Sequence, residues 1–302
     1  MFINNIDPVL LEVGVFEIRW YGLFLGMSAG LALWILMKLF KSRGLNPDDA
    51  LNVGVWLTIG GLLGARIGHI VFYNLDYYLS NPIEVIMIHH GGLSSHGMTF
   101  GLIVAFVVYM RITATPSSSP LGRGRVEWRR YADLLVVPIP LVAGFIRIGN
   151  FFNSEIVGRA TDLPWAVQFP LFELSAIGRH PSQIYEALIA FAIFGVLLWM
   201  YRKSNDGNPP LSPLACLPAR QGKWGGFNLV PTHTFIFLYF STRFLIEFVK
   251  EYHTLEAGLT MGQWLSVPFI VYSIGWFIYI VLKSPSFPRR GWGWLPLFYE
   301  SF

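Results

Sequence analysis

Seven long apolar stretches dominate the sequence and constrain its fold more than any other feature. A run of about 20 apolar residues is long enough to cross the hydrocarbon core of a bilayer as a helix. Only 13% of the residues are charged, whereas a soluble domain usually carries about 25%. We therefore predict an all-α integral membrane protein with seven transmembrane helices. The expected spans are Val15–Leu39, Ala50–Phe72, Gly97–Met110, Tyr131–Arg147, Ile184–Trp199, Val230–Val249 and Trp264–Leu282.

The positions of lysine and arginine predict the orientation of these spans. Most of the 22 basic residues fall in one set of connecting segments, and short loops rich in basic residues stay in the cytoplasm. The N-terminus is therefore expected to be extracytoplasmic and the C-terminus cytoplasmic. The net charge of +4 is explained by this topology, so no nucleic-acid partner is expected. The richer set is Lys38, Lys41, Arg43, Arg111, Arg123, Arg125, Arg129, Arg130, Arg202, Lys203, Arg220, Lys223, Lys283, Arg289 and Arg290.

The connecting segments show no sign of a further domain. Residues 1–302 are expected to form a single polytopic membrane domain, with flexible cytoplasmic loops at about 113–130 and 204–226 and a cytoplasmic tail at 284–302. These segments are polar or rich in Ser and Pro and lack apolar periodicity. A lone cysteine, Cys216, excludes a disulfide framework and a multi-cysteine metal site. We expect a monomer without a cofactor.

Glycines recur every four residues in the first two spans. This spacing places them on one helix face, where small residues let helix backbones approach closely. We therefore predict close helix packing on both faces. The glycines are Gly22, Gly26 and Gly30 in the first span and Gly60, Gly64 and Gly68 in the second.

Costly polar groups lie inside the spans, and each is a candidate for function. With the predicted orientation, five helices bring such groups to the extracytoplasmic half of the membrane. Each group also has a structural interpretation: an internal ion pair, a snorkelling arginine, an interfacial aromatic or a helix cap. The candidates are Tyr21, Arg66, His96, Arg147 and the pair Arg243 and Glu247, which share one helix face.

The segment from Arg147 to Arg159 adds amides and a carboxylate to this outer surface: Asn150, Asn153 and Glu155. Such a density of hydrogen-bonding groups fits recognition of a phosphate-bearing head group. The histidines around Gly91–Gly97 lack the helix spacing and the carboxylates of a zinc site. No metal site is therefore expected.

These residues together give the sequence a specific resemblance. It resembles the prolipoprotein diacylglyceryl transferase family over about Arg19 to Leu282, and it departs from the family pattern at Ala65, Ser95 and Ile146. The matching segments are Ile18–Gly22, Gly64–Gly68 with Phe72–Asn74, Gly91–Gly97, Arg147–Glu155 through Gly158–Arg159, Arg179–Glu186, Arg243–Glu247 and Met261–Gln263.

The resemblance implies an enzyme of the bacterial cytoplasmic (inner) membrane. Its reaction would move diacylglycerol from phosphatidylglycerol to the lipobox cysteine of a preprolipoprotein signal peptide and release glycerol 1-phosphate, on the extracytoplasmic side. We assign His96 as proton acceptor, Arg147 and Arg243 as a clamp for the leaving phosphate, and Glu247 as the group that orients Arg243. The residues expected to bind substrate are Tyr21, Arg66, Asn150, Asn153, Glu155, Gly158 and His180.

Two alternatives stay open on the sequence. A transporter or flippase for an anionic lipid would need the same buried arginines, although it favours sites at the membrane midplane and repeated halves. His180, next to Pro181, is either a cap of the fifth helix or a second titratable group.

Overall fold

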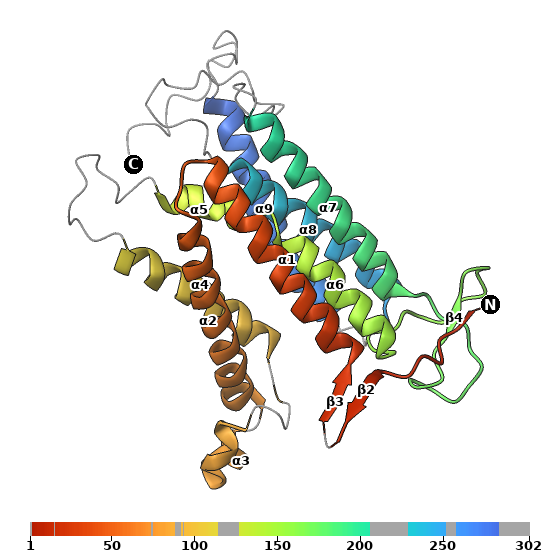
Figure 1. Cartoon of the computed structure of the whole chain (residues 1–302). Helices are drawn as coiled ribbons and strands as arrows, with labels where there is room; N and C mark the ends of the chain where they lie inside the picture. Colours follow the sequence, from red (N-terminus) through yellow and green to blue (C-terminus); the bar gives the residue numbers. More distant parts are fainter. Residues whose placement is uncertain are drawn as a thin grey trace. The chain divides into compact units, whose positions relative to one another are not determined.

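The computed structural model describes residues 2–14, 16–73, 75–87, 92, 94–113, 127–205, 229–251 and 258–283. These residues fall into two compact units (Figure 1). Unit 1 comprises residues 1–29 and 135–302, and unit 2 comprises Gly30–Leu134. Most of the two expected loops and all of the expected tail lie outside the described residues.

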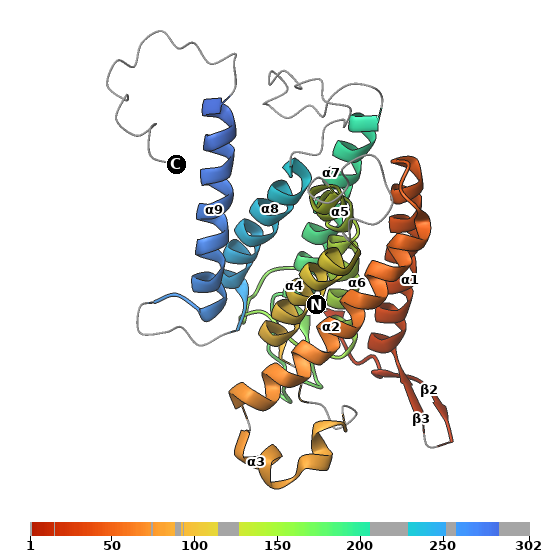
Figure 2. The same cartoon turned by 90° about the vertical axis from the view of Figure 1, so that its left-hand side faces the viewer.

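Unit 1 is a bundle of helices (Figure 2). Helix α6 packs on α7, α7 on α8 and α8 on α9. Aromatic rings fill these contacts, as in the stacked pair Phe240 and Phe269, whose centroids are 4.1 Å apart. The first part of α1 joins the bundle through Trp20, whose ring centroid lies 5.1 Å from that of Phe152. The helices are α1 (Trp20–Ser42), α6 (Ile139–Phe152), α7 (Ser182–Asn205), α8 (Val230–Ile246), the 3₁₀ helix η3 (Glu247–Val249) and α9 (Met261–Lys283).

Unit 2 is built around the pair α2 and α4, which is held by glycine. A Cβ atom on Gly64 would collide with the backbone of Gly97 and Gly101. The predicted glycine packing is therefore confirmed for the second span. In α1, by contrast, a Cβ built on any of its three glycines meets no atom of another described element within 4 Å. The same spacing therefore shows no close packing among the described residues of the first span. The elements are α2 (Pro47–Tyr73), α3 (Leu75–Ser80), the 3₁₀ helix η1 (Pro82–Val85), α4 (Ser95–Thr113) and α5 (Glu127–Leu135).

Two small sheets belong to the N-terminal part of the chain. Strand β1 (Phe2–Ile3) pairs in parallel with β4 (Val167–Gln168), and β2 (Val9–Val13) forms an antiparallel hairpin with β3 (Phe16–Arg19). The first span was expected to begin at Val15, but its helix begins at Trp20. The alternation of apolar and charged residues in Phe16–Arg19 has the period of a strand, and this pattern outweighs the apolar run.

Five helical segments are long and apolar enough to cross a membrane: Trp20–Ser42, Pro47–Phe72, Trp128–Phe152, Ser182–Lys203 and Gly262–Leu282. The other two expected spans correspond to α4 and α8, with 19 and 17 residues. The third of the five is interrupted by a turn between α5 and α6, where proline lacks the N–H that a continuous helix needs. The fold is thus that of a mainly helical membrane protein, whereas seven spans and their orientation remain predictions.

Candidate functional site

Four helices of unit 1 bring charged side chains to one end of the bundle. Arg147 lies in the last turns of α6, Glu186 near the start of α7, and Arg243 near the end of α8. Glu247 opens η3, and Lys250 follows it directly. Three of the expected groups, Arg147, Arg243 and Glu247, therefore lie together in unit 1, and the side of the membrane that they face stays a prediction.

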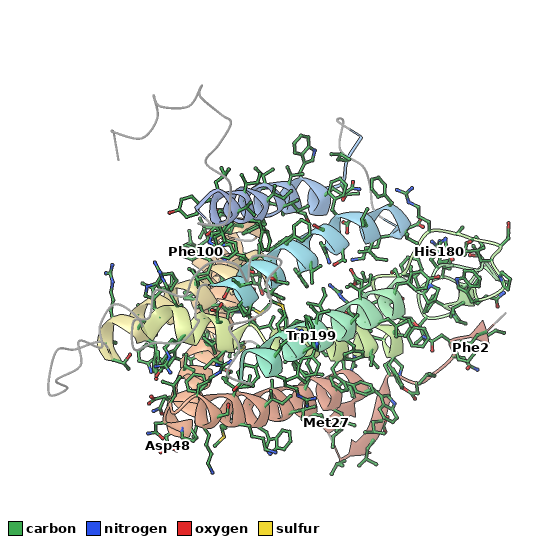
Figure 3. All side chains as sticks on the ribbon, turned by 90° about the horizontal axis from the view of Figure 1, so that it is seen from above. Phe2, Met27, Asp48, Phe100, His180 and Trp199 are labelled. Carbon is green, nitrogen blue, oxygen red and sulfur yellow. The ribbon has the colours of Figure 1, made fainter. Side chains whose placement is uncertain are left out.

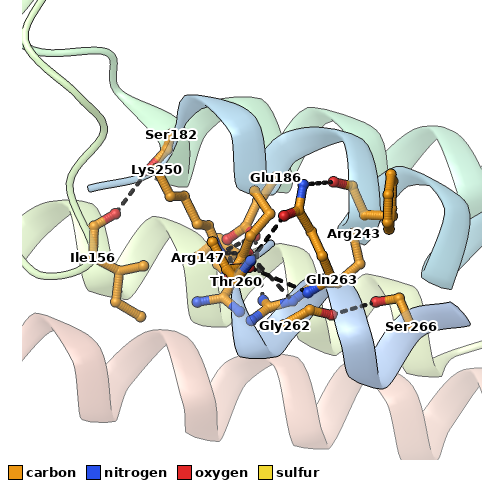
Figure 4. Close-up of polar contacts among 12 residues, drawn as sticks. Arg147, Ile156, Ser182, Glu186, Arg243, Lys250, Thr260, Gly262, Gln263 and Ser266 are labelled. Atoms are coloured by element: carbon orange, nitrogen blue, oxygen red, sulfur yellow. Dashed lines mark hydrogen bonds and ion pairs between the residues drawn. The ribbon is translucent and has the colours of Figure 1, made fainter. Parts of the chain in front are cut away.

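Glu186 is the centre of this charged cluster (Figure 4). Its Oε2 lies 2.7 Å from Nε of Arg147, and its Oε1 lies 3.4 Å from Nη1 of Arg243. The same Oε1 lies 2.5 Å from Nζ of Lys250. A single carboxylate therefore fixes two guanidinium groups and one ammonium group.

Glu247 is the second carboxylate of the cluster. Its Oε2 lies 3.9 Å from Nε of Arg243 and 3.8 Å from Nζ of Lys250. Its Oε1 accepts a hydrogen bond of 3.1 Å from the hydroxyl of Thr260. Gly262 leaves room for this carboxylate, because a Cβ there would collide with it. The predicted contact between Arg243 and Glu247 is confirmed, although Arg243 shares Glu247 with other partners.

Burial divides the cluster into an inner and an outer part. The side chains of Lys250, Glu247 and Glu186 are 0%, 3% and 9% exposed. The guanidinium-bearing side chains of Arg147 and Arg243 are 19% and 27% exposed. Burial lowers the pKa of the Lys250 ammonium to about 8, although the neighbouring carboxylate of Glu186 opposes this shift. Arg147 and Arg243 are thus the members that a ligand can reach.

A second polar network continues from Arg147 into the loop after α6. Nη1 of Arg147 donates to Oδ1 of Asn150 at 3.2 Å, and Nδ2 of Asn150 donates to Glu155 at 3.1 Å. Nδ2 of Asn153 donates to the other oxygen of Glu155 at 3.0 Å. Ser154, between these residues, has a left-handed backbone with φ of 55°. The amides and carboxylate singled out in the sequence therefore form one connected group.

The N-terminal residues hold this strained loop in place. Asn4 is fully buried, and its Nδ2 donates to the carbonyl of Phe151 at 2.7 Å and to the hydroxyl of Ser154 at 3.2 Å. Its backbone N–H donates to the carbonyl of Gln168 at 2.8 Å. A segment more than 140 residues away in sequence thus supports the loop, a link that no local pattern could have predicted.

Gly158 and His180 contact each other beside the cluster. The backbone N–H of Gly158 donates to the carbonyl of His180 at 2.9 Å, and a Cβ on Gly158 would collide with His180. The His180 ring lies near Tyr185, with Nδ1 3.3 Å from the hydroxyl oxygen. Figure 3 places His180 and Phe2 at the same end of unit 1. Contact of Gly158 or His180 with a substrate stays a prediction.

Tyr21 belongs to the same unit and packs on α6. A Cβ on Gly149 would meet the ring and the backbone of Tyr21, so this glycine permits the close approach of the two helices. Gly149 directly precedes Asn150 and follows Arg147 by two residues, so Tyr21 packs on the part of α6 that carries both residues. This position is compatible with the substrate-binding role predicted for Tyr21.

Arg66 and His96 belong to unit 2. Arg66 is 5% exposed and donates to backbone carbonyls of the segment before α4. Its Nε donates to Val85 at 3.0 Å, and its Nη atoms donate to Glu84, Met87 and Gly92. His96 lies in the first turn of α4, which Ser94 caps by accepting a hydrogen bond of 3.3 Å from the N–H of Gly97. The His96 side chain lies outside the described part of the structure.

Two members of the cluster were absent from the predicted site, Glu186 and Lys250. Glu186 falls inside an apolar span, so the rule that selected Arg66 and Arg243 could have found it. Lys250 follows the end of its span, where a lysine usually faces water, and only the folded structure shows that it is buried. Among the described residues, no three His, Cys, Asp or Glu side chains gather in a group that could hold a metal ion.

Comparison with known proteins places the chain among relatives of similar length. A sequence profile described as prolipoprotein diacylglyceryl transferase matches residues 8–279. The phosphatidylglycerol–prolipoprotein diacylglyceryl transferase of Chloroherpeton thalassium is 36% identical over 273 residues, covering 89% of this chain and 91% of that protein. Proteins of the same name from Porphyromonas gingivalis and Tolumonas auensis are 35% and 34% identical, covering 93% and 91% of this chain and 95% of each relative. The chain therefore belongs to the prolipoprotein diacylglyceryl transferase family and is a transferase.

Proposed function

We propose that this transferase moves the diacylglyceryl group of phosphatidylglycerol to the lipobox cysteine of a preprolipoprotein. The cysteine sulfur forms a bond to the terminal glyceryl carbon. The bond from that carbon to the phosphate oxygen breaks, and the oxygen leaves with the electron pair as glycerol 1-phosphate. The names of the relatives supply the substrates. The single structural observation that carries the proposal is the pair of partly exposed arginines around one buried carboxylate.

Arg147 and Arg243 stabilise the charge that develops on the leaving phosphate. A guanidinium group can donate two parallel hydrogen bonds to a phosphate, and its charge is worth most where water is scarce. Glu186 holds both groups from the buried side, and Glu247 adds a longer contact to Arg243. The donors that face away from these carboxylates are the ones assigned to the substrate.

The asparagine network is assigned to the polar head of the lipid. Glycerol carries hydroxyl groups that both donate and accept hydrogen bonds, and amides and carboxylates offer the matching partners. Asn150, Asn153 and Glu155 lie next to Arg147 through the bond from Arg147 to Asn150. They would therefore read the glycerol while the arginines hold the phosphate. Tyr21, Gly158 and His180 complete the proposed binding surface.

His96 is the proposed proton acceptor for the cysteine. An ordinary thiol has a pKa near 8.5, so at pH 7 only a few per cent is the reactive thiolate. Neutral histidine has a pKa of about 6.5 and can accept the proton, a contribution typically worth about 10²–10⁴-fold in rate. The reaction is proposed to take place on the extracytoplasmic side of the cytoplasmic membrane, by a monomer.

One measurement tests the proposal against a lipid transporter. Purified protein is mixed with phosphatidylglycerol and a lipobox peptide, and both products are followed. The expected result is thioether formation with one glycerol 1-phosphate released per thioether. The matched control is a peptide with serine in place of the lipobox cysteine. Transfer of lipid between leaflets without any thioether would establish a transporter instead.

Labelling from outside sealed cells tests the proposed orientation. Leu174 lies on a loop of unit 1 and is fully exposed. A Leu174→Cys variant should react with a membrane-impermeant thiol reagent. Native Cys216, which lies outside the described residues, should react only after the membrane is opened. Reaction of Cys216 in sealed cells would reverse the topology.

A further inference from the structure

Lys250 is a fully buried cation inside the charged cluster, where it contacts both carboxylates. Its Nζ lies 2.5 Å from Glu186 and 3.8 Å from Glu247, and its side chain is 0% exposed. A buried charge is costly unless it is paired, so its position between two carboxylates has to be explained. Because each of these carboxylates also contacts an arginine, Lys250 is linked to both Arg147 and Arg243.

The backbone around Lys250 is fixed by the loop that follows α6. Nε of Arg159 donates to the carbonyl of Lys250 at 3.0 Å, and the N–H of Arg159 donates to the carbonyl of Val249 at 2.8 Å. Gly158 forms an isolated antiparallel bridge with Lys250. Lys250 is therefore held inside the cluster, away from the edge where the arginines are exposed. It can influence a ligand only through its neighbours.

The balance of charges in the cluster favours an anionic ligand. Three cations, Arg147, Arg243 and Lys250, face two carboxylates, Glu186 and Glu247. Counted over these five described side chains, one positive charge is in excess, and it is the complement of a phosphodiester monoanion. Without Lys250, two arginines would face two carboxylates, and each guanidinium would be neutralised by the protein itself. Glu155 is exposed and reaches Arg147 only through Asn150, so it does not belong to this buried balance.

We propose that Lys250 is a positioning residue that acts through Glu186 and Glu247. It holds the two carboxylates inward and supplies the excess charge that keeps Arg147 and Arg243 available to a phosphodiester monoanion. This inference rests on the proposed function, because it takes the head group of phosphatidylglycerol as that monoanion. It assigns to Lys250 a role in substrate affinity, as distinct from a role in the chemical step.

Removing the charge tests the proposal. Lys250→Met removes the charge and keeps an unbranched side chain that is one atom shorter. In mixed micelles it should raise the KM for phosphatidylglycerol about tenfold, with a smaller change in kcat. This size corresponds to losing one unit charge about 10 Å from an anion at an effective dielectric constant of about 20. Lys250→Arg keeps the charge and should restore most of the affinity.

Arg179 offers a matched control. It is also a buried cation of unit 1, with 8% of its side chain exposed, and it pairs with Glu173 and Glu251 outside the cluster. Arg179→Gln should lower the unfolding temperature but leave the KM for phosphatidylglycerol within about twofold. A rise in KM equal to that of Lys250→Met would show a general effect of lost buried cations and would overturn the proposal.

A pH series keeps the test decisive even when Lys250→Met does not fold. The pKa of Lys250 is lowered to about 8, whereas arginine stays charged throughout this range. Between pH 7 and 9, the KM of the native protein should rise relative to that of Lys250→Arg, because only lysine loses its proton. The facing groups Glu186, Glu247, Arg147 and Arg243 are common to both proteins. A constant ratio of the two KM values overturns the proposal.

The same assay separates this inference from the proposed function. If the native protein forms no thioether, the function fails and the Lys250 comparison has no substrate. If the native protein forms thioether and Lys250→Met has the native KM, the function stands and the role of Lys250 is wrong.

Discussion

The arginines within the helices of the two units have different kinds of partner. In unit 1, Arg147 and Arg243 face the carboxylates of Glu186 and Glu247 and keep part of their surface exposed. In unit 2, Arg66 is 5% exposed and donates to neutral backbone carbonyls. The carboxylates contact Arg147 and Arg243 from the buried side, and the side chains of both arginines stay partly exposed. The guanidinium group of Arg66 instead donates hydrogen bonds to several backbone carbonyls of one segment. An arginine inside a span can therefore either bind a ligand or stabilise a loop. Its hydrogen-bond and ion-pair partners indicate which of the two roles it has.

The largest effect is expected at the helix contact that supports unit 2. Gly64→Val would push side-chain atoms into the backbone of Gly97 and Gly101. Backbone cannot move aside as a side-chain tip can, so the cost should reach about 3 kcal/mol or more, at the upper end of overpacking effects. Thermal unfolding in detergent measures it. Gly26→Val is the matched control, because no described atom lies near its Cβ. Equal losses in both variants would contradict the packing difference between α1 and α2.

The second prediction tests whether the arginines of the two units have different roles. Arg147→Lys and Arg243→Lys should each lower thioether formation by about 10²-fold, a loss typical of removing one positioned donor from a developing anion. Lysine keeps the charge but lacks the planar fork. Arg66→Lys should chiefly lower the unfolding temperature, because three ammonium donors cannot satisfy the carbonyls that Arg66 now serves. Rates and unfolding temperatures of the three variants decide between the two roles.

Near-normal turnover of correctly folded Arg147→Lys and Arg243→Lys would make these arginines structural. A loss of turnover in Arg66→Lys as large as theirs, without a loss of stability, would instead place Arg66 among the residues that contact substrate. Either result would remove the distinction between carboxylate and carbonyl partners.

The sequence predicted the helices better than it predicted the partners of the charged residues. Periodicity and apolar length are local properties, and helices occur at all seven expected stretches. The sequence also predicted that Arg243 and Glu247 share one helix face, since residues four apart on a helix are neighbours. The roles of Glu186 and of the buried Lys250 depend on contacts between α6, α7 and the end of α8. No local sequence pattern contains these contacts. The same applies to Asn4, whose partners are more than 140 residues away.

The hairpin before α1 was missed for a different reason. Phe16–Arg19 continues an apolar run into the span, and a window of hydropathy averages over the alternation that marks a strand. Its strand partner, Val9–Val13, is more apolar, with Glu12 as its one charged residue. Sequence reasoning therefore fails where two periodicities meet, and it extends the longer element.

The third prediction concerns His96, which the sequence alone nominates from unit 2. If His96 accepts the thiol proton, His96→Gln should lower single-turnover thioether formation by about 10²-fold near pH 7. The deficit should shrink as the pH rises toward the thiol pKa of about 8.5, because the thiolate then needs no base. A deficit that stays constant between about pH 6 and 9 would make His96 a positioning residue. The proton acceptor would then have to be sought at His180, Glu155 or the phosphate of the substrate itself.

The smallest effect is expected at an ion pair that includes neither the arginines of the charged cluster nor Arg66. Arg179 donates to both oxygens of Glu173, at 2.5 and 3.0 Å, and this hydrogen bonding holds the pKa of the Glu173 carboxyl below its ordinary value. A carboxyl with a lowered pKa in the folded state contributes stability above its ordinary pKa of about 4.3, and this contribution is lost as the pH falls through the folded value. Because Glu173 is 22% exposed, solvent screening should keep it below about 1 kcal/mol. Unfolding temperatures of the native protein and Glu173→Gln, compared at pH 7 and pH 3, should differ at the higher pH and converge at the lower one. An equal difference at both values would mean that the pair contributes through packing and not through its charge.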